Sequence, residues 1–150
     1  MIAPHGANMV QMGRGQVFRN VTPLDLSRIR RFVLESAIDG GGDPPAVDDL
    51  IIAVNEAVVN IVLHGYQNEP GEIEVNVGCM EGMIQVILLD YGPPFDPTIV
   101  VSPDISLPLE ERPFGGMGIH FMRQFCDDLR YRRDSAGRNE LILFKRFRPK

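Results

Sequence analysis

The 150-residue chain contains no tryptophan, and only two cysteines and three histidines. Cys79 and Cys126 belong to no CxxC or Cys/His pattern, so the sequence predicts neither a zinc site nor a disulfide framework, and it fits a reducing cytosol. No stretch approaches the roughly 18 apolar residues of a membrane span. The opening letters MIAPHGANMV lack the basic flank and the continuous apolar block of a signal peptide. We therefore expect a cytoplasmic protein that does not contact membranes.

An excess of positive charge is also missing. The chain has 15 basic and 20 acidic residues, a net charge of −5 and a pI near 5.1. Because affinity for nucleic acids depends largely on neutralising phosphates, this balance argues against a direct nucleic-acid partner. The length and the 44% content of apolar residues are typical of one globular domain. We expect residues 1–15 to form a mobile leader and residues 16–150 to form a single domain.

Hydrophobic periodicity predicts alternating groups of strands and helices. A helix capped by Thr22 and Pro23 follows the first strand, and the glycines and prolines of Asp39 to Pro45 predict a loop. A second helix begins at Ala46 and ends before NEPG, and a proline-rich loop without a clear period occupies residues 93–116. A third helix begins at Gly116. The predicted strands cover residues 15–21, 72–80, 83–92, 128–134 and 139–147.

Most of these strands are neighbours joined by short turns, such as the Glu81–Gly82 pair. Chains with this order pack helices against one side of a sheet. The expected fold class is therefore an α/β two-layer sandwich, in which a mixed, mainly antiparallel sheet carries helices on one face.

Three polar residues interrupt the second helix, in the segment NEAVVNIVLHGY. Glu56, Asn60 and His64 are spaced four apart, and helical residues at that spacing differ by only roughly 40° in direction. They therefore share one face, separate from the apolar stripe that includes Val54 and Val58. By itself this line is more typical of an exposed ridge.

A carboxylate ends the most apolar predicted strand, in ILLDYGPPFDP. An unpaired buried charge is unfavourable, so Asp90 needs a hydrogen-bond donor. It either caps its own loop as an Asx turn or accepts a hydrogen bond from an amino group of a ligand. In the second case Gly92, which has no side chain, would permit the backbone to approach the ligand closely.

A glycine cluster opens the third helix, in FGGMGIHFM. Amide groups at a helix N-terminus attract anions, and glycines let phosphates approach without obstruction. Gly115, Gly116 and Gly118 do not form a P-loop. Alone, they are equally compatible with a flexible junction.

In this order and spacing the three motifs resemble the nucleotide site of the GHKL ATPases, which share the histidine-kinase-like ATPase fold. The resemblance is strongest to the bacterial anti-sigma-factor serine/threonine protein kinases, and it covers about residues 16–147. It implies that Asn60 coordinates Mg²⁺ bridging the ATP phosphates, and that Asp90 accepts from the adenine amino group. It also implies that Gly92 packs near the adenine ring and that Glu56 is the general base for the attacking hydroxyl.

The same resemblance implies that Gly116, Met117 and Gly118 border the triphosphate beneath a lid formed by the proline-rich loop. It implies a role for His64 in the HGY triplet, either in packing or in phosphate contact. Two positions depart from the family pattern. Pro94 replaces a second glycine and removes a backbone donor, and Asn139 replaces a threonine. Both departures predict an altered adenine pocket.

The resemblance further implies the partners of the protein. An anti-sigma-factor kinase phosphorylates an anti-anti-sigma (STAS-domain) partner, sequesters a sigma factor and forms a homodimer. The alternative is a non-catalytic nucleotide-binding anti-sigma factor or partner-switching adaptor, which Pro94 and Asn139 favour. A sensor histidine kinase is disfavoured, because no predicted helical hairpin precedes Asn55 to present a phosphoacceptor histidine.

Overall fold

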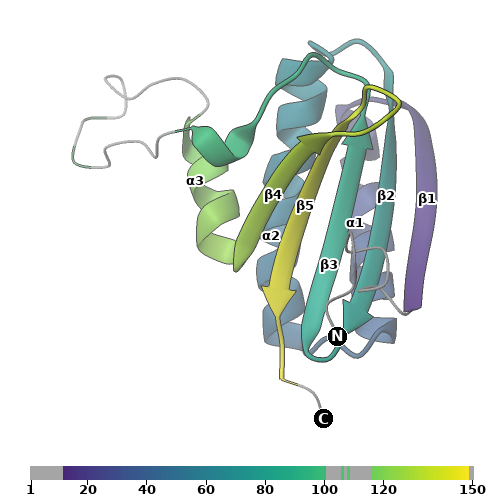
Figure 1. Ribbon diagram of the computed structural model, residues 1–150, viewed down its shortest axis with the longest axis vertical. Coiled ribbons are helices and arrows are strands. Elements are labelled where there is room, and N and C mark those ends of the chain that lie inside the picture. Colours follow the sequence, from purple (N-terminus) through teal and green to yellow (C-terminus); the bar gives the residue numbers. More distant parts are fainter. Residues whose placement is uncertain (1–11, 101–105, 107, 109–115, 149–150) are drawn as a thin grey trace.

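The computed structural model describes residues 12–100, 106, 108 and 116–148. In the described part of the chain, three α-helices cover one face of a five-stranded sheet, whose spatial order is β1-β2-β3-β5-β4 (Figure 1). Every strand pair between these five strands is antiparallel, so the predicted two-layer sandwich with a mainly antiparallel sheet is confirmed. The strands are β1 (Met12–Val21), β2 (Gly71–Met80), β3 (Met83–Asp90), β4 (Asp128–Arg133) and β5 (Asn139–Arg146), and the helices are α1 (Leu26–Asp39), α2 (Pro44–Asn60) and α3 (Gly116–Phe125).

The first strand begins earlier than the sequence indicates. β1 starts at Met12, and Gly13 to Gly15 pair with residues 76–78 of β2, although the leader was expected to extend to residue 15. This short glycine-containing run has no apolar alternation to mark it as a strand. It pairs because an edge strand needs only one hydrogen-bonded neighbour. The rest of the predicted leader lies outside the described residues.

Two helix starts also differ from expectation. Thr22 caps the chain as predicted, but Pro23–Asp25 form a 3₁₀ turn before α1. α2 begins at Pro44, inside the predicted loop, with Asp43 at its N-cap. Proline is tolerated in the first helical turn, because the amide groups there have no partner within the helix.

The apolar stripe of α2 is the centre of the core. Val47, Leu50, Val54, Val58 and Val62 are at most 1% exposed, as the spacing predicts. The stripe packs on the helix-facing side of the sheet, where Ile73, Val86 and Leu88 are fully buried. This packing fixes the position of the polar residues Glu56 and Asn60 of α2 relative to the ends of the strands. No helix among the described residues is long and apolar enough to cross a membrane.

The end of α2 widens immediately after Asn60. Ile61–Gly65 form a π-helical turn, and the Tyr66 N–H donates to the Ile61 carbonyl at 2.8 Å. The Tyr66 hydroxyl then donates to the Glu72 carbonyl at 2.6 Å and accepts from the Tyr91 N–H at 2.8 Å. One side chain therefore joins the end of α2 to the start of β2 and the end of β3.

Removing that hydroxyl tests its structural role. We expect Tyr66→Phe to lower the free energy of unfolding by roughly 1–2 kcal/mol, because two hydrogen bonds are lost while the ring stays packed. Denaturant titration measures the change. Tyr91→Phe is the matched control, since Tyr91 is 57% exposed. This substitution should lower the free energy of unfolding by less. Equal effects of the two substitutions would contradict the bridging role of Tyr66.

Candidate nucleotide site

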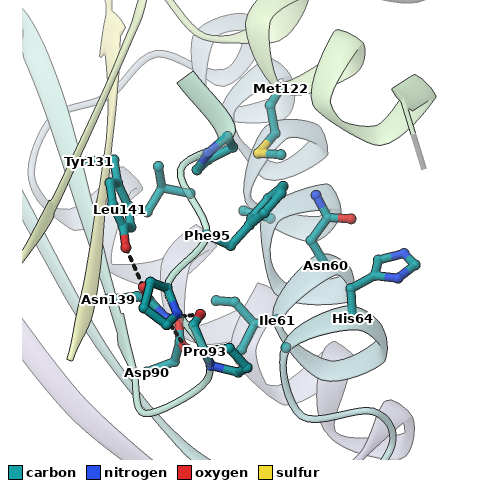
Figure 2. Close-up of a pocket in the computed structure, with 14 residues that line it drawn as sticks. Asn60, Ile61, His64, Asp90, Pro93, Phe95, Met122, Tyr131, Asn139 and Leu141 are labelled. Atoms are coloured by element: carbon teal, nitrogen blue, oxygen red, sulfur yellow. Dashed lines mark hydrogen bonds between the residues drawn. The ribbon is translucent and has the colours of Figure 1, made fainter. Parts of the chain in front are cut away.

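A cavity of about 240 Å³ lies between α2 and the sheet. Figure 2 shows Asp90 and Asn139 on its sheet side and Asn60 and His64 on its helix side. Its walls are largely apolar, which suits a flat aromatic ligand with a few polar contacts. The lining residues are Ala57, Asn60, Ile61, His64, Gly65, Asp90, Pro93, Pro94, Phe95, Pro97, Met122, Tyr131, Asn139 and Leu141.

Asp90 is a buried polar group on the sheet side, and it is 5% exposed. Its Oδ1 accepts from the Gly92 N–H at 2.8 Å and from Asn139 Nδ2 at 3.0 Å. Burial raises the pKa of the Asp90 carboxyl, while these two hydrogen bonds and the charge of Arg133 oppose the rise. Among the described residues, no donor reaches Oδ2. The Asx turn and the ligand acceptor weighed in the sequence are therefore compatible, because each uses a different oxygen.

Gly92 lies where a side chain would be crowded. A Cβ at this position would be 3.0 Å from Asp90 Oδ1 and 3.4 Å from the Cα of Gly65. The two glycines therefore bring the start of the loop after β3 against the end of the π-helical turn. Gly65 and Asp90 both line the cavity, so this close approach lies beside it.

Glu56 and Asn60 converge on the N-terminal turn of α3. A Cβ at Gly118 would lie 3.2 Å from Glu56 Oε1 and 3.7 Å from Asn60 Oδ1. The two oxygens of α2 therefore lie close to the glycine cluster that opens α3. Both residues are only partly buried, so part of each remains accessible to solvent.

The amide of Asn60 is incompletely bonded. Its Nδ2 is buried and has no hydrogen-bond partner among the described residues, and a buried amide normally finds one. The described residues contain no cluster of three or more His, Cys, Asp or Glu side chains that could hold a metal ion. A site with one or two protein oxygens is nevertheless compatible with Mg²⁺, which keeps several waters and takes further ligands from phosphates. Asn60 and Glu56 fit such a site.

The structure describes the other predicted site residues in less detail. His64 is exposed and lines the cavity at its rim, next to Asn60 (Figure 2). Gly116 and Met117 begin α3, and only their helical backbone is described. Most of the predicted lid, and Gly115, lie outside the described residues. The part that is described contains the 3₁₀ turn η4 (Pro97–Ile99), capped by Asp96.

Several wall residues were not predicted as part of the site. Tyr131 and Leu141 come from the last hairpin, and Met122 comes from α3. Phe95 extends into the cavity from the loop after β3 (Figure 2). Their hydrophobic side chains predict burial, but no local sequence pattern indicates that these residues line the same cavity.

Comparison with known proteins gives the family. Residues 20–145 match the model of the histidine kinase-like ATPase domain. The chain is 35% identical over 94 residues to the serine-protein kinase RsbW of Bacillus thuringiensis (strain Al Hakam), and equally so to RsbW of Bacillus anthracis. Each alignment covers 60% of this chain and 59% of the relative. The chain thus spans about three fifths of the length of the curated relatives it matches.

A solved structure supports the same fold. The crystal structure of the RsbU and RsbW domains of Rv1364c from Mycobacterium tuberculosis matches with a TM-score of 0.60 and 20% identity. The match covers 91% of this chain and 33% of that chain. The resemblance seen in the three sequence motifs is therefore confirmed, and the chain belongs to the family of histidine kinase-like ATPase domains.

Proposed function

We propose that this protein binds ATP with Mg²⁺ and phosphorylates a serine or threonine of a STAS-type anti-anti-sigma partner, in a bacterial partner-switching system. The observation that carries the proposal is the convergence of Glu56 Oε1 and Asn60 Oδ1 on Gly118, where Asn60 also lines the cavity that contains Asp90. The similarity to serine-protein kinases supports it. The sigma factor as a second partner and the homodimer belong to the same proposal.

The site offers different chemistry at its two sides. Asp90 Oδ2 would accept from the exocyclic amine of the base. Asn60 Oδ1 would hold the metal without adding charge, and the helix N-terminus at Gly118 would face the phosphates. Bound Mg²⁺ would neutralise charge on the transferring phosphoryl group.

In this proposal Glu56 acts on the incoming hydroxyl. Its carboxylate lies one helical turn before Asn60, at the same glycine. It would accept the proton as the hydroxyl oxygen attacks, the role of a general base. The non-catalytic alternative retains nucleotide binding but leaves this carboxylate without that role.

The assignment of Glu56 is tested by Glu56→Gln. We expect phosphoryl transfer to fall by roughly 10²–10⁴-fold, the usual contribution of a general base, whereas ADP affinity stays within a few-fold of wild type. Transfer is followed with radiolabelled ATP and purified STAS proteins. Glu35→Gln, at an exposed position of α1, is the matched control and should transfer normally.

Two results would count against this proposal in different ways. Label transfer that survives Glu56→Gln would refute the assigned base. Tight ATP binding by the wild type, with no transfer to any STAS partner, would select the non-catalytic adaptor.

The metal role of Asn60 is tested by Asn60→Leu. The substitution removes the Oδ1 ligand together with a buried amide nitrogen that has no partner, so we expect the free energy of unfolding to stay equal or rise. Mg²⁺ should raise the ATP affinity of the wild type by at least roughly tenfold, about 1.4 kcal/mol, and that of the variant hardly at all. Calorimetric titrations with Mg²⁺ and with EDTA measure both affinities.

Asn55→Leu serves as the control for Asn60→Leu. Asn55 lies on the same helix but accepts from Arg30 of α1 at 2.8 Å, away from the cavity. Its magnesium dependence should equal that of the wild type. A normal magnesium dependence in Asn60→Leu would remove Asn60 from the metal site.

A further inference from the structure

Asn139 lies at the centre of a hydrogen-bond network behind the nucleotide cavity. It is 6% exposed, and it is the first residue of β5. In the sheet it is the Cα partner of Asp90 in β3 and of Arg133 in β4. Three strand ends therefore place an amide between a carboxylate and a guanidinium, on the side of the sheet that faces the cavity.

Both halves of the Asn139 amide are fully engaged. Nδ2 lies 3.0 Å from Asp90 Oδ1, 3.1 Å from the Gly92 carbonyl and 3.0 Å from the Pro93 carbonyl. Its Oδ1 accepts from the Tyr131 hydroxyl and from Arg133 Nη1 at 3.2 Å. Figure 2 shows the bonds among Tyr131, Asn139, Asp90 and Pro93 as one continuous network. The amide cannot rotate without breaking all of them.

This network leaves one oxygen of Asp90 available. Oδ1 is held by Asn139 Nδ2 and by the Gly92 N–H, and no donor among the described residues reaches Oδ2. The carboxylate is thus fixed in rotation, with a single acceptor left for a ligand. Asn139 lines the cavity, but its amide donors are already used, so none is left to donate to the base.

We propose that Asn139 is a positioning residue that sets base specificity through Asp90: it holds Asp90 as an oriented carboxylate, so that the cavity accepts a 6-amino purine and rejects a 6-oxo purine. The inference rests on the proposed binding of adenine nucleotides. The contact between Asp90 and the base was already part of the proposed function. The new element is the role of Asn139, which stands where the family pattern has threonine and which orients Asp90.

The physical reason concerns the state of the carboxyl group. A carboxylate oxygen accepts from an amino group, but it repels the oxo group of hypoxanthine or guanine. A neutral carboxyl group could donate to that oxo group instead. Burial raises the pKa of Asp90, and the hydrogen bond from Asn139 is the first of the effects that lower it again. Loss of this bond therefore shifts the pKa of Asp90 further upward and frees the group to rotate.

Other charged or titratable groups lie around Asp90, and their effects on nucleotide binding have to be distinguished from the effect of Asp90. Arg133 of β4 lowers the pKa of Asp90, and Tyr66, after the π-helical turn, interacts with it electrostatically. His64 lies on the rim of the same cavity. The ratio of ADP affinity to IDP affinity isolates the base, because the two nucleotides carry the same ribose and phosphates.

The test compares wild type with Asn139→Leu, which has nearly the same shape but no donor, by calorimetry with ADP and IDP across pH. We expect the wild type to prefer ADP by roughly 10²-fold and the variant by less than roughly tenfold, the scale of discrimination lost with one polar contact. Because preference for ADP requires the carboxylate, it falls as pH decreases through the pKa of Asp90. In the variant this fall should occur at higher pH.

Asn139→Ser provides a second variant if leucine prevents folding. The serine hydroxyl is one bond closer to the backbone than the amide nitrogen and does not reach Asp90, so the same loss of preference is expected. Asn76→Leu is the matched control. Asn76 lies on β2 on the sheet face away from the helices, and donates to Glu74, and its substitution should leave the ratio unchanged.

The possible results distinguish failure of the role of Asn139 from failure of the proposed nucleotide binding. If Asn139 only stabilises the fold, its variants weaken ADP and IDP equally, and an unchanged ratio and pH profile would overturn the inference. If the wild type binds neither nucleotide, the proposed function itself fails.

Discussion

The arrangement of the cavity depends on one buried carboxylate at the end of β3. A charge at this depth is stable only when its hydrogen-bonding capacity is satisfied. Asp90 uses one oxygen to meet that need from within the protein, through Gly92 and Asn139. The same bonds close the turn after β3 and fix the direction of the other oxygen. The requirement for stability and the requirement for ligand recognition are therefore met by different atoms of one side chain.

The register of the sheet makes this possible. Asp90, Asn139 and Arg133 are terminal residues of three neighbouring strands, and the antiparallel pairing aligns them in one row. Cross-strand neighbours on one face lie close enough to interact directly. A shift of one residue in β5 would turn Asn139 to the opposite face, where it could not reach the carboxylate. The long apolar contact of β3 and β5 with the helices thus fixes the polar geometry at their ends.

Most of the fold could be predicted from the sequence, since helical and strand periods are local properties. The prediction failed where a local signal was ambiguous, as at Pro44, which suits both a loop and a first helical turn, and at Met12–Gly15, which has no alternation. The candidate site divides in the same way. Glu56, Asn60 and Asp90 stand out as polar residues in apolar segments. The contribution of Tyr131 and the network of Asn139 depend on strand pairing between distant segments, and no local pattern reports that pairing.

The two sides of the cavity differ in how complete they are, and this difference has a physical meaning. On the sheet side, Asn139 has all its polar atoms bonded and holds Asp90 in one orientation before any ligand arrives. On the helix side, the Asn60 amide retains a buried nitrogen that no described residue bonds. It lies where α2 widens into a π-helical turn, a feature that is frequent at functional sites. A preorganised side suits a rigid aromatic base, whose shape does not change during a reaction. An incompletely bonded side suits the proposed phosphates and metal ion, because these groups would supply polar contacts and would leave after each reaction.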